Sequence, residues 1–401
     1  MPVVAENDMV TDMREKSGFA NHHMIIVLVV FFLTGCTILP EPIQSKHFGD
    51  EGPLGRCADF FSSLDHQIST AKTFDAGAFK VKDYPYLRAN RFLVSFRKEV
   101  IDNNAFAAWI DRMQALDQDV RYHEILNLPP TGENTAAVSD KKDELLRQVA
   151  DCGNFLKSID FRDAETRQRL SNEISVPDEY ILLHRVLGVY PVARLFVSRG
   201  VRRWHNEERS KFSIEAPEGW HAISYVPEKS GDMPTASQVV EEAFRDDLGI
   251  PKYSPEAMTA LLQIYAPIWE VQTQGAYDRI GAPFWIREDK LGVDTRQPVT
   301  FTRISYTRFE KKILTQLNYT IWFPSRPKEK ALDIYGGFLD GVTFRITLDK
   351  NGSPLLYETM HNCGCYYKAY PTDRLHVREK IDYANHLLFF HLLKLIVRIR
   401  S

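Results

Sequence analysis

The chain has 401 residues, of which 44% are hydrophobic and 26% are charged, and its formal net charge is -3. This composition supplies enough apolar material for a packed core and excludes a disordered or fibrous protein. The charges are spread without large single-sign blocks, so the sequence offers no basic face for nucleic acid. Because single cores rarely exceed about 250 to 300 residues, the length favours two domains.

Residues 1–35 are predicted to form a signal peptide. The apolar run at 24–33 is about ten residues long, whereas a helix needs about 20 to cross a bilayer. Arg14 and Lys16 precede the run and supply the positive charge that such peptides carry near their start. A start at Met13 would give the signal peptide a more usual length than a start at the first residue.

The apolar run is followed by Leu33-Thr34-Gly35-Cys36, which places small residues directly before a cysteine. This pattern resembles the lipobox of bacterial lipoproteins, in which the cysteine is acylated and becomes the first mature residue. The resemblance implies that acyl chains such as palmitate on Cys36 attach the protein to membrane lipid, and two or more chains make such an attachment stable. The alternative is a free cysteine after a buried apolar segment.

The residue after the lipidated cysteine bears on the membrane in which such a protein resides. In the lipoproteins that this sequence resembles, an Asp at that position favours retention in the inner membrane. Thr37 stands there in this chain. The resemblance therefore implies the periplasmic face of the outer membrane, with the inner membrane as the less favoured location.

The mature part is predicted to begin with a lipidated tether over residues 36–56, because proline and glycine interrupt any helical or strand period there. A helical domain is predicted over residues 57–212, where apolar residues recur at intervals of three and four. Pro191 is expected to break or kink its last long helix, at 181–204. This apolar stretch also contains His and Arg, which favours a buried helical hairpin over a membrane-surface segment.

Residues 213–235 are rich in proline and glycine and are predicted to link this domain to a sheet domain over residues 236–401. A short helix is predicted at 236–248. Alternating patterns rich in aromatic and β-branched residues then predict strands at 261–273, 299–308, 313–323, 341–348 and 355–360. Asn351-Gly352 predicts a hairpin between the last two strands. The sequence therefore predicts an α+β protein, with a helical domain followed by a mainly antiparallel sheet.

The C-terminal stretch at 386–400 places His391, Lys394 and Arg398 on one helical face and apolar residues on the other. A helix that packs on the sheet and closes the second domain is the favoured interpretation. A basic amphipathic segment on the membrane surface and a C-terminus altered by a frameshift are the alternatives.

Four cysteines follow Cys36, and export would place them in a compartment that oxidises thiols. Cys57 and Cys152 lie on apolar faces of predicted helices in the same domain, so we predict a disulfide between them. Closing so long a loop would stabilise the fold by about 4 to 5 kcal/mol in the chain-entropy model. Two buried free thiols are the alternative.

Two thiols and an imidazole fall within five residues, at His361, Cys363 and Cys365. In one interpretation they bind a soft or borderline metal ion such as copper or zinc, with a further ligand from His376, His386 or His391. In a second, the two cysteines form a strained disulfide that exchanges with substrate thiols. In a third, they form a disulfide, with each other or with other cysteines, that only staples a loop to the sheet.

The same segment resembles a His-x-Cys-Gly-Cys-Tyr stretch of uncharacterised proteobacterial lipoproteins. Those proteins also have segments similar to Tyr-Asp-Arg-Ile-Gly at 277–281 and Gln-Leu-Asn-Tyr at 316–319. The similarity spans most of the mature chain. It implies no activity, because none is known for that group.

A thiol-dependent hydrolase would use Cys365 or Cys363 as its nucleophile and His361 or His376 as its base. No flanking signature of a known thiol hydrolase accompanies these residues. The sequence also lacks a Walker loop, a Gly-x-Ser-x-Gly elbow and a His-Glu-x-x-His motif. The common nucleotide-binding and hydrolase classes therefore lose support.

The strand predicted at 313–323 has Gln316, Asn318 and Thr320 on one face, with Trp322 beyond them. These side chains line either a polar pocket that includes Asp278 or Arg308, or the solvent-facing side of an antiparallel sheet.

Together these patterns predict a membrane-anchored periplasmic lipoprotein that binds a metal ion or takes part in envelope assembly, and not a housekeeping enzyme. Its expected partners are membrane lipid, through acylated Cys36, and envelope proteins. A thiol-dependent hydrolase or a thiol–disulfide redox protein that uses Cys363 and Cys365 is the alternative.

Overall fold

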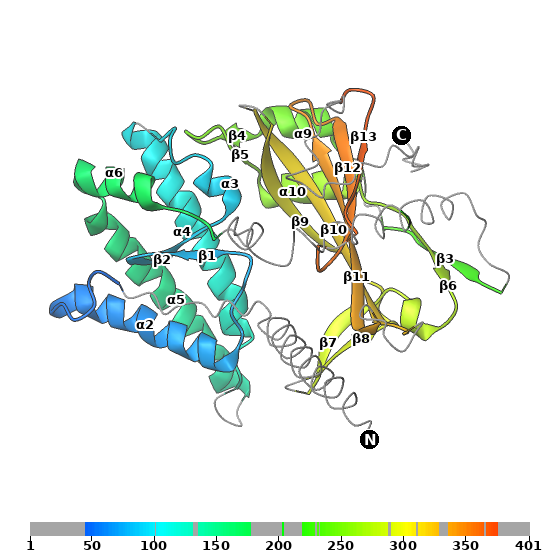
Figure 1. Cartoon of the computed structure of the whole chain (residues 1–401), viewed down its shortest axis with the longest axis horizontal. Helices are drawn as coiled ribbons and strands as arrows, with labels where there is room; N and C mark the ends of the chain where they lie inside the picture. The colour runs from blue at the N-terminus through cyan, green and yellow to red at the C-terminus, as the bar shows by residue number, and fades with distance from the viewer. Residues whose placement is uncertain are drawn as a thin grey trace, which may run out of the picture.

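The computed structural model describes residues 45–375, except residues 101, 131–134, 178–202, 204–218, 229–230, 232, 288–289, 310–311, 329–335 and 365. Helices dominate the first half of the described chain, and antiparallel sheets dominate the second half (Figure 1). The predicted α+β class is therefore confirmed. The predicted signal peptide, Cys36, the helical hairpin at 181–204 apart from Arg203, and the C-terminal helix lie outside the described residues.

Four helices of ten or more residues build the described first half: α2 (Gly52–Ala71), α4 (Asn103–Leu126), α5 (Thr135–Asp160) and α6 (Ala164–Glu173). Asp102 and Asp163 cap α4 and α6, since each carboxylate accepts a hydrogen bond from a first-turn amide, at 2.7 and 2.6 Å. α2 already begins at Gly52, with a proline in its first turn, where a helix needs no N–H from it. Helix therefore begins at residue 52, inside the stretch 36–56 that was predicted to be a tether.

A β-hairpin lies between α2 and α4, where the sequence predicted only helices. β1 (Phe79–Val81) pairs with β2 (Tyr84–Ala89), and the short helix α3 (Arg91–Val94) follows. All six residues of β2 are buried, so no alternation of apolar and polar residues distinguishes this strand. The core around it includes the fully buried side chains of Phe61, Tyr86, Leu87, Trp109 and Met113.

The second half is built on a five-stranded antiparallel sheet in the order β13-β12-β11-β10-β9. Its strands are β9 (Phe301–Phe309), β10 (Lys312–Arg326), β11 (Gly337–Leu348), β12 (Pro354–His361) and β13 (Lys368–Pro371). The first four confirm the strands predicted at 299–308, 313–323, 341–348 and 355–360, whereas β13 was not predicted.

The loop between β11 and β12 contains Asn351 and Gly352, as predicted. Gly352 adopts a φ of 79°, which favours glycine. The Asp349 carboxylate accepts hydrogen bonds from the amides of Asn351 and Ser353, both at 2.8 Å. These bonds fix the hairpin and hence the register in which β11 and β12 pair.

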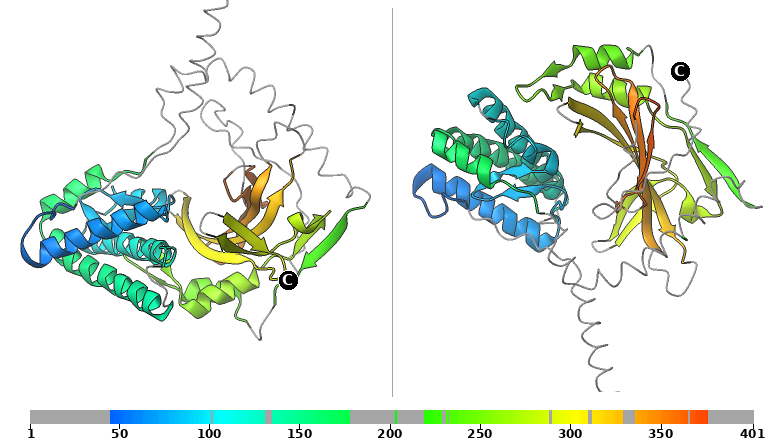
Figure 2. Two further views of the ribbon diagram at one scale, coloured as in Figure 1. Left: turned by 90° about the horizontal axis from the view of Figure 1, so that it is seen from below. Right: turned by 45° about the horizontal axis from the view of Figure 1, so that its top comes forward.

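Two helices cover one face of this sheet: α9 (Ala236–Glu242) and α10 (Pro255–Ile264) (Figures 1 and 2). Alternate residues of β10 and β11 point toward them and form a second core, which includes Leu261, Leu317, Tyr319, Phe344 and Ile346. The other residues of these strands point to the opposite face, where polar side chains gather.

Three predictions around α9 and α10 are wrong. Residues up to Ile264 of the predicted strand 261–273 are helical, because Pro255 starts α10 and Ser254 caps it; only β6 (Trp269–Thr273) is a strand. β6 pairs with β3 (His221–Tyr225), which lies inside the predicted linker 213–235. The helix predicted at 236–248 stops at Glu242, and a small hairpin of β4 (Phe244–Arg245) and β5 (Pro251–Lys252) follows.

The two halves share packing and ion pairs. Ile250, which precedes β5, is fully buried and belongs to the core of the helical half. Arg112 on α4 forms a 2.7 Å ion pair with Asp246, and Arg308 on β9 forms one of 2.8 Å with Glu99. Packing therefore continues across the domain boundary predicted at residues 235 and 236.

A separate two-stranded hairpin precedes the large sheet and was not predicted. The short helix η1 (Ala276–Asp278) leads into β7 (Ala282–Arg287), which pairs with β8 (Lys290–Asp294). Figure 1 shows this hairpin projecting from the lower end of the sheet. None of the described helices is both long enough and apolar enough to cross a membrane.

Candidate functional site

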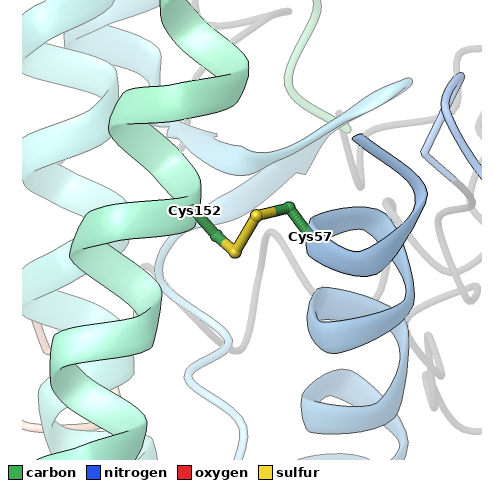
Figure 3. Close-up of a disulfide and its surroundings, with 2 residues drawn as sticks. All are labelled: Cys57 and Cys152. Atoms are coloured by element: carbon green, nitrogen blue, oxygen red, sulfur yellow. A yellow bond between two sulfur atoms is a disulfide. The ribbon is translucent and has the colours of Figure 1, made fainter. Parts of the chain in front are cut away.

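The predicted disulfide between Cys57 and Cys152 is present. It joins α2 to α5, with a Cα–Cα distance of 5.2 Å and a sequence separation of 95 residues (Figure 3). The bond links the two helices that flank the β1–β2 hairpin and is expected to stabilise the helical half by about 4 to 5 kcal/mol. Its role in the described structure is therefore to hold the scaffold.

The segment predicted to carry chemistry begins at the end of β12. His361 and Gly364 close a tight turn, since the Gly364 amide donates to the His361 carbonyl at 2.7 Å. Asn362 fastens this turn to the sheet: its Oδ1 accepts from Thr343 at 2.8 Å, and its Nδ2 donates to the Ile321 carbonyl at 3.2 Å. The turn is thus held by two neighbouring strands.

His361 is oriented by two neighbours. Its Nδ1 lies 3.2 Å from Oδ1 of Asp340, and its ring centroid lies 4.8 Å from that of Tyr366. Burial raises the pKa of the Asp340 carboxyl, but hydrogen bonds from His361 and the Gly341 amide lower it more, so the pKa lies below its ordinary value. The pair leaves Nε2 as the ring atom available to a ligand.

Cys363 lies in the same turn, exposed and with a free thiol. Among the described residues no hydrogen bond joins this thiol to His361, and no group of three His, Cys, Asp or Glu residues gathers as a metal site would require. Cys365 and the further candidate ligands His376, His386 and His391 lie outside the described residues. The structure therefore brings two of the three predicted ligands into one turn.

The prediction that Gln316, Asn318 and Thr320 share one face of a strand is confirmed. They lie opposite Thr347, Arg345 and Thr343 on β11. Each pair is joined by a side-chain hydrogen bond, of 3.1, 2.7 and 3.0 Å respectively. We call this row, together with Glu358 of β12, the polar face.

Glu358 is the most enclosed charge of the polar face, with 5% of its surface exposed. Its carboxylate accepts hydrogen bonds from Tyr367 at 2.5 Å and from Thr347 at 3.4 Å, and Nη1 of Arg345 lies 3.8 Å away. Burial and then the neighbouring carboxylate raise the pKa of Tyr367, so its phenol remains protonated and donates. Tyr367, Thr347 and Arg345 thus satisfy the Glu358 carboxylate within the sheet.

Two residues proposed for a polar pocket lie elsewhere. The Asp278 carboxylate accepts hydrogen bonds from the amides of Gln274 and Gly275, at 2.7 and 3.2 Å, and shapes its own loop. Arg308 stacks over Phe96 of the helical half, 4.4 Å from the ring centroid. Neither joins the polar face.

Sequence reasoning missed the Arg345 and Glu358 pair. A signal for it existed, because the Asn351-Gly352 hairpin places these opposite charges directly across from each other. The pairing required the exact length of the loop, which the sequence pattern did not supply.

A larger cluster of charges lies inside the helical half and was also missed. Arg121 is fully buried and bonds Asp65 and Asp117, both at 2.9 Å. Arg88 bonds Asp117 at 3.1 Å and Glu124 at 2.7 Å. Each of these charges has an oppositely charged partner, so the cluster fills a structural role.

A groove of about 390 Å³ lies between α2, the end of α4 and α5. Its lining includes His66, Leu145 and Lys142. Lys142 donates hydrogen bonds to the carbonyls of Leu126, the last residue of α4, and of Leu128 beyond it, at 2.7 and 3.0 Å. The exposed surface of the lining is mainly apolar, as is usual in pockets that bind small molecules.

Comparisons with known proteins give no match: no family model, no curated protein and no solved structure is significantly similar to this chain. Any function must therefore be argued from the residues of the chain itself.

Proposed function

We propose that this chain is an exported lipoprotein, attached through acyl chains on Cys36 to the periplasmic face of the outer membrane, where its body binds a ligand or an envelope protein. The observation that carries the proposal is the Leu33-Thr34-Gly35-Cys36 sequence directly after a short apolar run. The Cys57–Cys152 disulfide supports export, because disulfides persist in oxidising compartments and are rare in the cytosol.

Contacts at the start of the described chain support a short connection to the lipid. Lys46 and His47 bond the buried Asp160 carboxylate, at 2.8 and 2.7 Å, and Tyr86 donates to the same carboxylate at 2.7 Å. The chain from Cys36 to this fixed point spans on the order of 35 Å at full extension. An acylated Cys36 would therefore hold the body close to the bilayer surface.

Mass spectrometry and membrane fractionation test this proposal. We expect a mature N-terminus at Cys36 that carries acyl mass, and recovery of the wild-type chain with outer-membrane fractions. Cys36→Ala should release the chain from the membrane, whereas the control Cys363→Ser, which also removes one thiol, should remain bound. A wild-type chain with an unmodified Cys36 would overturn the proposal.

A metal-thiolate site at His361, Cys363 and Cys365 is the second candidate function. The Asp340–His361 contact favours it, because a carboxylate on one ring nitrogen orients the other toward a metal ion. Copper or zinc suits such ligands. The alternative remains a thiol-dependent hydrolase or redox protein that uses the same cysteines.

Elemental analysis of residues 37–401, purified without chelator or affinity metal, distinguishes the metal site from the hydrolase or redox alternative. About one equivalent of copper or zinc per chain is expected, and the double variant Cys363→Ser, Cys365→Ser should lose it. A single variant Cys363→Ser that keeps the metal would exclude Cys363 as a ligand. A wild-type body without metal would refute the site.

A further inference from the structure

The β7–β8 hairpin exposes three consecutive apolar side chains. Phe284, Trp285 and Ile286 are 46%, 58% and 52% exposed, and Phe338 at the start of β11 is 79% exposed. Lys290 links Phe338 to the hairpin, since its Nζ lies 5.5 Å from the Phe338 ring centroid. We call these four apolar residues the aromatic patch.

Both faces of the hairpin are apolar. Successive residues of a strand point to opposite sides, so Phe284 and Ile286 lie on one face and Trp285 on the other. The side chains of Phe284 and Ile286 both lie against Gly292 of β8, which confirms that they share a face. A hairpin that packed on a core would expose only one apolar face at most, and large exposed apolar patches mark interaction sites.

Two observations favour a lipid surface as the partner of this patch. Trp is enriched at membrane interfaces, and segments that lie in the interface bury Trp, Phe and other apolar side chains there. Residues 36–46 reach no more than about 35 Å from an acylated Cys36, so the body stays near a bilayer.

We propose that the aromatic patch inserts into the interface of a phospholipid bilayer and forms a second membrane contact beside the lipid anchor. The choice of a membrane as partner rests on the proposed lipid attachment. The formal charges of Arg287, Glu288, Asp289 and Lys290 cancel, so apolar burial dominates and binding is expected to vary little with salt. Attachment at two points orients the body, because the tether alone permits rotation.

Vesicle binding by residues 37–401 tests the inference without the acyl chains. These residues contain every described element and both cores. With vesicles of phosphatidylethanolamine and phosphatidylglycerol, we expect saturable binding that Phe338→Ser weakens by about tenfold, the loss of one buried aromatic side chain. Phe244→Ser is the matched control, because Phe244 is 69% exposed but lies on β4.

Fluorescence quenching by brominated acyl chains provides an independent readout. The chain contains six tryptophans, and we expect the quenching to disappear in Trp285→Phe, which keeps an apolar side chain at this position.

Three results would overturn the inference: no binding of the wild-type body to vesicles, equal weakening by Phe244→Ser and Phe338→Ser, or self-association that Phe338→Ser abolishes in the absence of lipid. The last result would assign the patch to a second copy of the chain. Since this body lacks Cys36, these outcomes are independent of whether Cys36 is acylated.

Discussion

Arg121 in the helical half and Arg345 in the sheet half are both paired with carboxylates, yet their surroundings differ. The Arg121 side chain is inaccessible to solvent and lies between Asp65 and Asp117, whereas the Arg345 side chain is 28% exposed, 3.8 Å from Glu358. Removing Arg121 leaves two buried carboxylates short of a charged partner, whereas removing Arg345 leaves Glu358 its 2.5 Å hydrogen bond from Tyr367. The helical half is thus expected to be the more sensitive of the two to the loss of a charged partner.

Removal of the disulfide should have the largest effect on this contrast. Cys57→Ser with Cys152→Ser is expected to lower the free energy of unfolding of the helical half by about 4 to 5 kcal/mol. Urea unfolding, followed by tryptophan fluorescence and circular dichroism, measures the loss. Reduction of the wild-type protein should reproduce it, and a reduced protein with unchanged stability would contradict the expectation.

Arg121→Met should cost about 3 to 5 kcal/mol, because it leaves Asp65 and Asp117 buried with fewer partners. The matched change Arg345→Met should cost about 1 kcal/mol or less. Both are measured by urea unfolding. Similar losses for the two variants would show that burial does not separate the halves in the way proposed here.

In the sheet half, Gly341→Ala should cause the largest loss of stability among the changes proposed for that half. An added Cβ would lie 2.0 Å from Nδ2 of Asn362 and 2.7 Å from the Ile321 carbonyl oxygen, so the turn that carries His361 and Cys363 must shift. A loss of about 1 to 3 kcal/mol is expected. Gly337→Ala on the same strand meets no atom within 4 Å and should leave the thermal midpoint unchanged.

Tyr367→Phe should cost about 1 to 2 kcal/mol, since it removes the 2.5 Å hydrogen bond to the Glu358 carboxylate. Thermal unfolding measures this loss. Glu358→Gln keeps an acceptor for Tyr367, so it should be the milder change. The reverse order would mean that Arg345, rather than Tyr367, is the main partner of Glu358.

The smallest expected effect is on the stability of the helical half at acidic pH, where Asp65 and Glu124 should act in opposite directions. Burial raises the pKa of Asp65, but Arg121 and Lys80 lower it more, so it lies below its ordinary 3.8. Such a carboxylate stabilises the fold above pH 3.8, and this contribution is lost as the pH falls below that value. Burial raises the pKa of Glu124 above 4.5 despite Arg88, so its protonation opposes this loss.

Urea midpoints between pH 6 and pH 2 test these opposite signs, over a range of about 2 units on either side of the ordinary carboxyl pKa. The loss of stability below pH 4 should be shallower in Asp65→Asn than in the wild type. In Glu124→Gln it should be no shallower. A flattened profile in Glu124→Gln alone would reverse the assignment.

The predicted strands succeeded where one side of the sheet is apolar and the other polar, because that asymmetry produces a period of two. The pattern around Leu317 and Asn318 is an example, and Asn351-Gly352 gave the hairpin next to it. β2 was not predicted, because all of its residues are buried and no alternation of apolar and polar residues marks it. Helix α10 was not predicted, because apolar residues recur from the helix through to β6 and no change of pattern separates the two elements. Only Ser254 and Pro255 mark the start of the helix.

The candidate site was predictable in part for a similar reason. Short-range features such as the spacing of His361 and Cys363, or the shared face of Gln316 and Asn318, are properties of a single segment. The Asp340–His361 contact and the charge cluster around Arg121 join segments far apart along the chain. Sequence periodicity carries no information on such pairings, because any exposed or buried carboxylate produces the same pattern locally.

Ile250 has a consequence for the order in which the chain folds. Because the N-terminal residues are synthesised first, Cys57 and Cys152 are available before residue 250. The helical half nevertheless lacks one of its own core side chains until residue 250 has emerged. Its final closure is therefore delayed, and during that interval a chaperone or protease meets an incompletely filled core.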